Sequence, residues 1–405
     1  MEELNKKIVR ITGAEFGNKG AEAMLLMVAE TVRRNLSGVE IVARMRSMDF
    51  AQTADSARIV LEKEPPRAWV RRIIAWIKTP KIHYKAAATI DVGGYQFGDT
   101  WGANYARNKA RQTKKWIRSG EPVFFLPQAW GPFSAAPVSK AVREILNIAT
   151  LSFARDKTSL TQIQKLVGTN NQRVRFAHDI AWNFKGDDLI VGKQLIEETG
   201  FSLNDNKLTV CLTPNTQVYS RTKGSSGPQN EYIVLLREIA EHLCKTHNAQ
   251  VILLGHQFLE DNSARKDDRT LCNYIISSLD RSLPVVHLDK TLSAAKVKSV
   301  IGNCDLLLSS RYHALIAAMS QGVPSAAIGW SHKYDELMSE VGLNSNVISL
   351  TKIKKDILRD VDLIVERTAQ AKETLKSMVP QMKQSGQKAL DDVISAIKDK
   401  FAGVT

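Results

Sequence analysis

The sequence predicts an α/β protein of two domains, each with a parallel β-sheet and helices on both faces. The chain has 405 residues, and a single hydrophobic core rarely serves more than about 250 to 300. Short apolar segments typical of buried strands alternate with longer segments of helical periodicity in both halves of the chain. Several of the strand segments end in glycine-rich or polar turns, as in parallel sheets that bind ligands at the carboxyl ends of their strands.

The first half of the chain opens with a strand at 7–12, which ends in a loop with glycines at positions 13, 17 and 20. A helix at about 21–35 follows, because apolar residues recur there at helical spacing. The glycine spacing matches neither the dinucleotide-binding fingerprint nor the phosphate-binding P-loop. Two interpretations therefore stay open for this loop: a ligand-binding turn, or a tight turn that lets the helix pack closely on its strand.

Three later strands of the first half also end in glycine-rich or polar turns. They are predicted at 88–92, 121–126 and 150–154, and the turns that follow them hold Gly94, Gln128 and Arg155. The carboxyl ends of parallel strands lie at one edge of a sheet, so we expect these turns to converge there.

The second half repeats the alternation of strands and helices. It begins with a strand at 208–212 and a long polar loop at 213–230, which is basic at its centre. A stretch at 304–324 then reads as a buried strand, a turn that carries Arg311 and His313, and a helix of small residues. The predicted divisions are a first domain at 1–185, a second domain at 186–350, and helices at 351–405 that cover the domains.

The composition is that of a globular enzyme, with 43% hydrophobic and 24% charged residues and a mean hydropathy of −0.21. No apolar run reaches membrane-spanning length, and the N-terminus lacks a signal-peptide core, so we expect a cytoplasmic protein. The four cysteines are widely spread, which predicts neither a disulfide framework nor a zinc site. A net charge of +14 favours anionic partners. Nucleic acid is the least expected of them, because the charge is spread along the chain and no recognition module is visible.

A segment at 65–85 combines tryptophan, isoleucine and basic residues. Its apolar face consists of Trp69, Val70, Ile73, Ile74 and Ile77, and Arg71, Arg72 and Lys78 lie off that face. One interpretation is an ordinary amphipathic helix that packs on its domain. The other is an interfacial helix, at about 67–78, that docks the protein on the anionic inner face of a membrane.

Arg155 and Arg311 share one setting: each follows a buried strand and precedes a helix, one in each predicted domain. If the two sheets face each other across a cleft, both guanidinium groups can reach one anion, and their planar forks suit a carboxylate or a phosphate. The alternative for each is a solvated or structural ion pair, for instance between Arg155 and the neighbouring Asp156.

His313 is the candidate proton donor, because a bound dianion would raise the pKa of an imidazole at a helix start. The alternative is a histidine hydrogen-bonded to the backbone. Lys333 follows another strand and is placed to meet phosphate, although surface lysines are common. His178 and His256 lie at strand ends and are second-rank candidates. The sequence shows no paired-carboxylate signature and no serine nucleophile elbow. It also shows no acidic cluster suited to a metal ion, so no metal is predicted.

An ordered set of motifs resembles the polysaccharide pyruvyl transferase family. In chain order they are Gly13-x-x-x-Gly17-Asn18-Lys19-Gly20-Ala21-Glu22-Ala23, Gly93-Gly94, Pro127-Gln128-Ala129-Trp130-Gly131-Pro132, Phe153-Ala154-Arg155-Asp156-x-x-Ser159, His178-Asp179, Ser310-Arg311-Tyr312-His313-Ala314, Gly322-Val323-Pro324 and Lys333. The resemblance covers roughly residues 8–340.

The resemblance implies a glycosyltransferase-B-like pair of Rossmann-like domains facing each other across a cleft. It also implies transfer of pyruvyl from phosphoenolpyruvate onto two hydroxyls of a glycan or of a lipid-linked or nucleotide-linked sugar, as a ketal and without a cofactor. Arg155 and Arg311 would hold the donor, His313 would protonate its methylene carbon, and Lys333 would face phosphate or acceptor. The further substrate-binding candidates are Tyr312, Asn18, Gly20, Gly94 and Gln128. The second domain would hold the donor, and the first would lie on the acceptor side.

Two other functions stay open from the sequence. A sugar-nucleotide-dependent glycosyltransferase of the same architecture would use the same small-residue helix and Gly322-Val323-Pro324 turn, together with Asp335 and Glu336. A non-catalytic basic protein at the membrane surface would need neither Arg311 nor His313.

Overall fold

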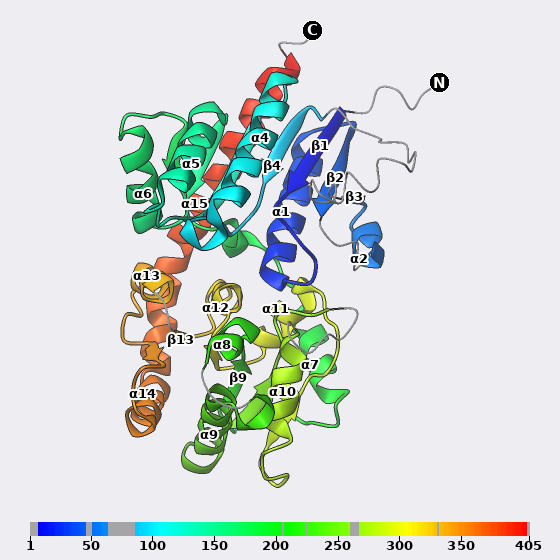
Figure 1. Cartoon of the computed structure of the whole chain (residues 1–405). Helices are drawn as coiled ribbons and strands as arrows, with labels where there is room; N and C mark the ends of the chain where they lie inside the picture. The colour runs from blue at the N-terminus through cyan, green and yellow to red at the C-terminus, as the bar shows by residue number, and fades with distance from the viewer. Residues whose placement is uncertain are drawn as a thin grey trace, which may run out of the picture. The chain divides into compact units, whose positions relative to one another are not determined.

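The computed structural model describes residues 7–45, 51–63, 86–204, 206–222, 226–259, 267–329 and 332–402. Its contacts divide the chain into two compact units (Figure 1). The N-terminal unit comprises Met1–Phe16, Met24–Ile180 and Ser385–Thr405, and the C-terminal unit comprises Gly17–Ala23 and Ala181–Gln384. The sequence-based ranges 1–185, 186–350 and 351–405 differ from this division. The contacts assign the loop and helix start at 17–23 to the C-terminal unit, and they divide the last helix between the two units.

The sheet of the N-terminal unit is parallel throughout. Its strands are β1 (Lys7–Thr12), β2 (Val39–Met45), β3 (Val60–Lys63), β4 (Ala88–Asp91), β5 (Tyr95–Phe97), β6 (Val123–Trp130), β7 (Leu151–Ala154) and β8 (Val174–Phe176). They lie in the order β3-β2-β1-β4-β6-β7-β8, and β5 pairs with the far end of β6. The order reverses between β1 and β4, which is where doubly wound sheets bind ligands.

Helices cover both faces of this sheet (Figure 1). They are α1 (Lys19–Asn35), α2 (Ala51–Ser56), α4 (Gly102–Arg118), α5 (Ala136–Ile148), α6 (Lys157–Val167) and the C-terminal part of α15 (Thr368–Ala402), with a short 3₁₀ turn at Asp99–Trp101. Val123 and Phe125 of β6 pack with α4 and α5, whereas Leu126 lies with α1 and α15. Successive side chains of one strand are therefore buried on opposite faces, as the α/β prediction requires.

The C-terminal unit repeats the design with six parallel strands. They are β9 (Thr209–Thr213), β10 (Gln250–Leu253), β11 (Val285–His287), β12 (Leu306–Ser309), β13 (Ser325–Gly329) and β14 (Val347–Ser349). Their order is β11-β10-β9-β12-β13-β14, so the switch point lies between β9 and β12. Two parallel-sheet α/β domains are thus confirmed.

The helices of this unit also lie on both faces of its sheet. They are α7 (Leu189–Glu197), α8 (Thr216–Arg221), α9 (Glu231–Thr246), α10 (Asp268–Ile276), α11 (Ala294–Gly302), α12 (Tyr312–Met319), α13 (His332–Glu340), α14 (Lys354–Glu366) and the first part of α15, with 3₁₀ turns at Ile180–Asn183 and Gly227–Gln229. A core of fully buried aliphatic side chains joins one sheet face to α9, α10 and α14. The helices α7 and α12 both pack against α11 in the same unit.

Two local predictions are wrong. The strand predicted at 121–126 instead runs through Pro127 to Trp130, so Gln128 lies inside β6. The strand accommodates the proline, which lacks an N–H, because its pairing with β7 is irregular between Phe125 and Gln128. The predicted loop at 213–230 contains α8 and a 3₁₀ turn, and the Asn215 side chain caps α8 by accepting the Gln217 N–H at 2.8 Å.

The segment at 65–85 lies outside the described residues, so both interpretations of it stay predictions. Among the described helices, none is long and apolar enough to cross a membrane. All four cysteines are free, and three of them are buried.

Candidate active site

The turn between β12 and α12 lies at the switch point of the C-terminal sheet. Three side chains hold this turn in place through hydrogen bonds to Ser310. Its carbonyl oxygen accepts hydrogen bonds from Asn215 Nδ2 at 2.7 Å and from the Tyr334 hydroxyl at 2.6 Å, and its own hydroxyl accepts one from Tyr232 at 2.8 Å. Arg311 follows as the N-terminal cap position of α12, so Tyr312 and His313 lie in the first turn of that helix.

Arg311 is buried, and its guanidinium group is bonded within the C-terminal unit. Nη2 forms an ion pair with Asp268 and donates to Thr216 Oγ1 at 3.0 Å, while Nη1 donates to Gln257 Oε1 at 2.9 Å. Nε is buried and has no hydrogen-bond partner among the described residues. Arg311 thus has the structural ion pair that the sequence left open as an alternative, and it keeps one N–H for another acceptor.

His313 lies directly against Gly20 from the start of α1. A Cβ atom added to Gly20 would be 2.2 Å from His313 Cγ and 2.4 Å from His313 Cβ. Asn18 caps the same helix, because its Oδ1 accepts the N–H groups of Gly20 at 3.1 Å and Ala21 at 3.3 Å. A β-bridge also joins Asn18 to Gln257. Two predicted site residues, Gly20 and His313, are therefore in contact, and Asn18 acts as the cap that positions the first of them.

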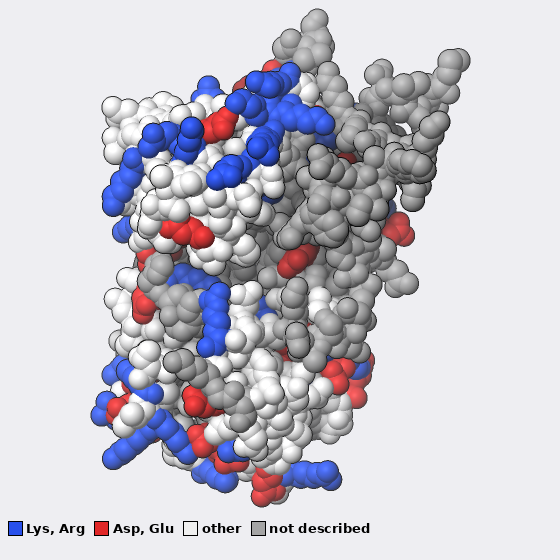
Figure 2. All heavy atoms as spheres, viewed as in Figure 1, with Lys and Arg blue, Asp and Glu red and all other residues white. Residues whose placement is uncertain are grey.

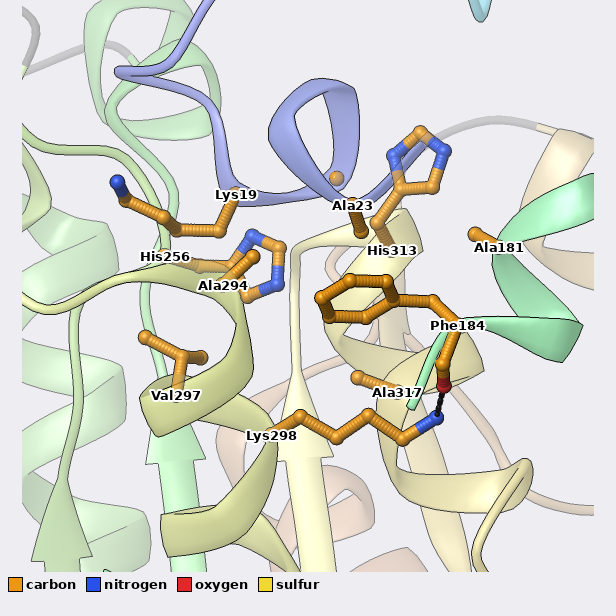
Figure 3. Close-up of a pocket in the computed structure, with 11 residues that line it drawn as sticks. Lys19, Ala23, Ala181, Phe184, His256, Ala294, Val297, Lys298, His313 and Ala317 are labelled. Carbon is orange, nitrogen blue, oxygen red and sulfur yellow. Dashed lines mark hydrogen bonds between the residues drawn. The ribbon is translucent and has the colours of Figure 1, made fainter. Parts of the chain in front are cut away.

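A small pocket beside His313 opens to solvent (Figure 3). All of the residues that line it belong to the C-terminal unit. They are Lys19, Gly20, Ala23, Ala181, Phe184, His256, Ala294, Val297, Lys298, His313 and Ala317. The pocket thus combines four nitrogen-bearing side chains with small and aromatic walls.

The Lys19 ammonium is neutralised inside this pocket. Its Nζ lies 2.6 Å from Glu22 Oε2, and both side chains are almost fully buried. Burial lowers the pKa of Lys19 and raises the pKa of Glu22, and each partner opposes the shift of the other. The second Glu22 oxygen accepts the Ala294 N–H at 2.9 Å, at the start of α11. This pair ties the first turn of α1 to α11.

His256 and Lys298 are buried bases whose pKa values are lowered. Burial lowers the pKa of His256 well below 6.5, and Arg311, His313 and Lys19 lower it further, so this imidazole is neutral at pH 7. Burial and the nearby Lys383 lower the pKa of Lys298 to about 7. Lys298 Nζ donates to the Phe184 carbonyl oxygen at 2.5 Å, as Figure 3 shows, and to Ser320 Oγ at 2.7 Å. Within the described part of the chain, no ion pair joins it to a carboxylate, so an anion in the pocket would be its counter-charge.

The pKa of Lys298 predicts a pH-dependent stability. The ordinary value is 10.5, so between about pH 7 and 10.5 the unfolded chain binds more protons at this position than the folded chain does. We expect wild type to gain stability over the Lys298→Met variant as pH rises through this window, by at most about 1.4 kcal/mol per pH unit. Thermal melts of both proteins at about pH 6, 7.5 and 9 measure the difference. A difference in melting temperature between the two proteins that stays constant across the pH series would contradict the lowered pKa of Lys298.

Of the three candidates in the N-terminal unit, Gly94 and Arg155 follow the ends of β4 and β7, and Gln128 lies in the last part of β6, the strand between them. The Gly94 carbonyl accepts the Ala129 N–H at 2.9 Å, and the Gln128 carbonyl accepts the Arg155 N–H at 3.0 Å. Arg155 Nη1 lies 3.2 Å from Asp179 and its Nε lies 4.0 Å from Asp156, so this arginine also has structural ion pairs. The Gln128 amide is fully buried, and neither of its polar atoms has a partner among the described residues. A joint site of Arg155 with Arg311 stays a prediction.

Tyr312 and Lys333 are partly exposed residues of the C-terminal unit, and neither lines the pocket. The Tyr312 ring contacts the His313 ring edge-on, with centroids 5.4 Å apart. Lys333 Nζ lies 5.0 Å from the ring centroid of Tyr334, whose hydroxyl holds Ser310. Both residues therefore neighbour the β12–α12 turn, and their binding roles stay predictions.

A model of the family described as "Polysaccharide pyruvyl transferase" matches residues 18–332 of the chain. The chain belongs to this family. The matched range contains every predicted site residue except Lys333, which follows it directly. Family membership supports an enzyme of polysaccharide pyruvyl transfer.

Similar proteins agree with the family and the fold. The amylovoran biosynthesis protein AmsJ of Erwinia amylovora is 23% identical over 322 residues, which are 76% of this chain and 73% of AmsJ. The structure of HepE from Anabaena, solved with UDP-glucose, matches with a TM-score of 0.55 and 15% identity over 98% of this chain and 99% of HepE. A UDP-N-acetylglucosamine 2-epimerase structure from Listeria monocytogenes matches with a TM-score of 0.61 and 11% identity over 98% and 97%. At these identities the two structures establish the fold alone, which is the glycosyltransferase-B-like architecture.

Several residues of the pocket were not among the predicted site residues. Lys19, Phe184 and Lys298 come from three separate segments, and His256 is only a second-rank candidate in the sequence. His256 carries a weak local signal, because it follows strand β10. Lys298 carries none, because it occupies the middle of a short helix, and the segment around Phe184 and Gly186 that packs on it lies far away in the sequence.

Proposed function

We propose that this chain transfers the pyruvyl group of phosphoenolpyruvate onto two hydroxyls of a sugar and so forms a cyclic ketal with release of phosphate. The observation that carries the proposal is the pocket of the C-terminal unit, where His313 and Lys298 line one cavity. The family match supports pyruvyl transfer to a polysaccharide. Phosphoenolpyruvate as the donor and a cyclic ketal as the product are our proposals beyond the family match.

The charges around the pocket favour an anionic donor. Lys19 is neutralised by Glu22, and Arg311 by Asp268, whereas Lys298 has no carboxylate partner among the described residues. Phosphoenolpyruvate carries a carboxylate and a phosphate, and a phosphate monoester has a charge of about −1.5 to −2 at neutral pH. Such an anion would raise the pKa of Lys298 and keep its ammonium protonated. The Nε–H of Arg311, for which the described residues provide no acceptor, offers a further donor on the same unit.

His313 is the proposed general acid. It delivers a proton to the methylene carbon of the donor, which leaves C2 electrophilic, and one sugar hydroxyl adds there. The C2–O bond to phosphate then breaks, and the second hydroxyl adds to C2 and closes the ring. The two sugar hydroxyls release two protons. One of them reprotonates the His313 imidazole, and the other leaves as part of the hydrogen phosphate ion. The neutral imidazole of His256 is available to accept a hydrogen bond from a hydroxyl.

We further propose that the exposed face of α4 meets anionic groups at the inner membrane surface. Figure 2 shows basic side chains gathered over the part of the N-terminal unit where α4 lies. The exposed basic residues of this helix, which contains no acidic residue, are Arg107, Arg111, Lys115 and Arg118. Each cation near an anionic membrane contributes about 1 kcal/mol of attraction.

A vesicle-binding measurement tests this face. We expect Arg107→Gln, Arg111→Gln and Lys115→Gln together to weaken binding to phosphatidylglycerol-containing vesicles by roughly 100-fold. The matched control changes the same number of exposed basic residues in the C-terminal unit, by Lys355→Gln, Arg359→Gln and Lys372→Gln. Equal losses in the two triple variants would mean that net charge, and no particular face, governs membrane binding.

Two assays test the proposed reaction. Calorimetry should show saturable binding of phosphoenolpyruvate. In the absence of phosphoenolpyruvate, sugar nucleotides should bind more weakly than phosphoenolpyruvate does. Phosphate release should require both phosphoenolpyruvate and a sugar acceptor from a panel of lipid-linked and nucleotide-linked sugars. Tight binding of a sugar nucleotide, with no measurable binding of phosphoenolpyruvate, would favour a glycosyltransferase instead.

A further inference from the structure

A cluster of two histidines and one aspartate lies on the C-terminal unit and outside the pocket. His242 belongs to α9, His247 follows the last residue of that helix, and Asp362 lies on α14. Asp362 Oδ1 is 2.6 Å from His242 Nε2 and 2.7 Å from His247 Nε2. One ligand atom from each residue lies within 4.8 Å of the other two. Among the described residues, this is the one group of His, Cys, Asp or Glu side chains that converges in this way.

The packing of the two helices fixes these ligands. Figure 1 shows α9 and α14 next to each other, and Ile239, Leu243, Val361 and Ile364 belong to one buried core between them and the sheet. The cluster stands at the edge of this core, with side chains that are 20%, 17% and 33% exposed. An ion can therefore enter from solvent, while the ligands are held by rigid elements.

The donor set matches a small divalent transition ion. Two imidazole nitrogens and one carboxylate oxygen are common Zn²⁺ ligands, and a tetrahedral site would separate them by roughly 3.3 Å. The ring nitrogens need to move less than about 1 Å from the carboxylate oxygen to reach that separation. His242 Nδ1 lies 3.3 Å from Thr246 Oγ1, and a hydrogen bond from Nδ1–H to that oxygen leaves Nε2 with its lone pair toward the ion.

We propose that His242, His247 and Asp362 form a zinc-binding site that fastens α14 to α9. Three protein ligands leave one position of a tetrahedral ion for water, and none of the three residues lines the pocket. The site therefore contributes to the stability of the C-terminal unit and is separate from the proposed transfer reaction.

Calorimetry with Zn²⁺ on the full chain, without an affinity tag and after chelator treatment, tests the proposal. We expect one ion per chain, a raised melting temperature, and loss of affinity by about 100-fold or more in His247→Gln and in Asp362→Asn. Asp360→Asn is the matched control, because Asp360 lies on the same helix and pairs with Lys352 instead. It should bind Zn²⁺ like wild type.

Two further measurements keep the result unambiguous. Circular dichroism establishes that each variant is folded before titration. X-ray absorption of the zinc-loaded wild type should show two imidazole nitrogens with oxygen ligands. Absence of stoichiometric binding in wild type, or equal affinity in Asp362→Asn and Asp360→Asn, would overturn the site and leave the cluster as a hydrogen-bonded contact between two helices.

Discussion

Replacing His313 with glutamine is expected to lower kcat by about 10²- to 10⁴-fold, the usual contribution of a general acid. Glutamine keeps a polar side chain of similar length beside Gly20 but cannot deliver a proton to the methylene carbon. The bound donor still meets Lys298, so the Michaelis constant for phosphoenolpyruvate should change far less than kcat. Steady-state kinetics of acceptor-dependent phosphate release measure both constants.

His287→Gln is the matched control for this substitution. His287 lies on β11 in the same unit, and its Nδ1 bonds with Asn273 at 2.9 Å. It does not line the pocket, so activity should stay near that of wild type. A His313→Gln variant that turns over like the control, with the same fold by circular dichroism, would remove His313 from the chemistry.

The second large effect is expected from Gly20→Ala, a change of a single methyl group. The added Cβ would lie 2.2 Å from His313 Cγ and 2.4 Å from His313 Cβ, closer than real Cβ contacts come. The first turns of α1 and α12 must therefore separate. Such overpacking costs typically about 1–3 kcal/mol. A displacement of about 1 Å in a catalytic group can reduce activity by about 10²-fold. Thermal melts and kinetics measure the two losses separately.

A double variant distinguishes this contact from a general loss of helix stability. In a His313→Gly background the added methyl group no longer meets the ring or the Cβ of residue 313, so Gly20→Ala should then leave the melting temperature nearly unchanged. Ala21→Ser is the control on the neighbouring position, which is only half buried. Equal destabilisation by Gly20→Ala in both backgrounds would show that its effect does not act through His313.

The sequence predicts the fold class well because the relevant signals are local. Apolar strands, helical periodicity and glycine turns alternate along the chain, and both sheets follow from that pattern. The order of motifs also predicts the family. Local signals fail at Pro127, where an irregularity in strand pairing lets β6 continue, and at 213–230, where Asn215 starts a short helix inside a polar segment.

The site is predicted only in part, because its contacts join segments far apart in sequence. Gly20 and His313 are each recognisable from their turns, but their contact is a tertiary property. The burial that lowers the pKa of Lys298 comes from a segment more than a hundred positions earlier, which no local pattern reports. Arg311 shows the converse case: its turn signals an anion site, whereas its strongest contact is the buried carboxylate of Asp268.

The most direct test of the proposed reaction is to run it in D₂O with phosphoenolpyruvate and a sugar acceptor, and to examine the product by NMR and mass spectrometry. Because a solvent-derived proton is delivered to the methylene carbon, the product should be a cyclic ketal whose methyl group carries one deuteron, formed in step with phosphate release. A product that retains the unsaturated methylene group, or a chain that releases no phosphate with any acceptor, would contradict pyruvyl transfer through His313.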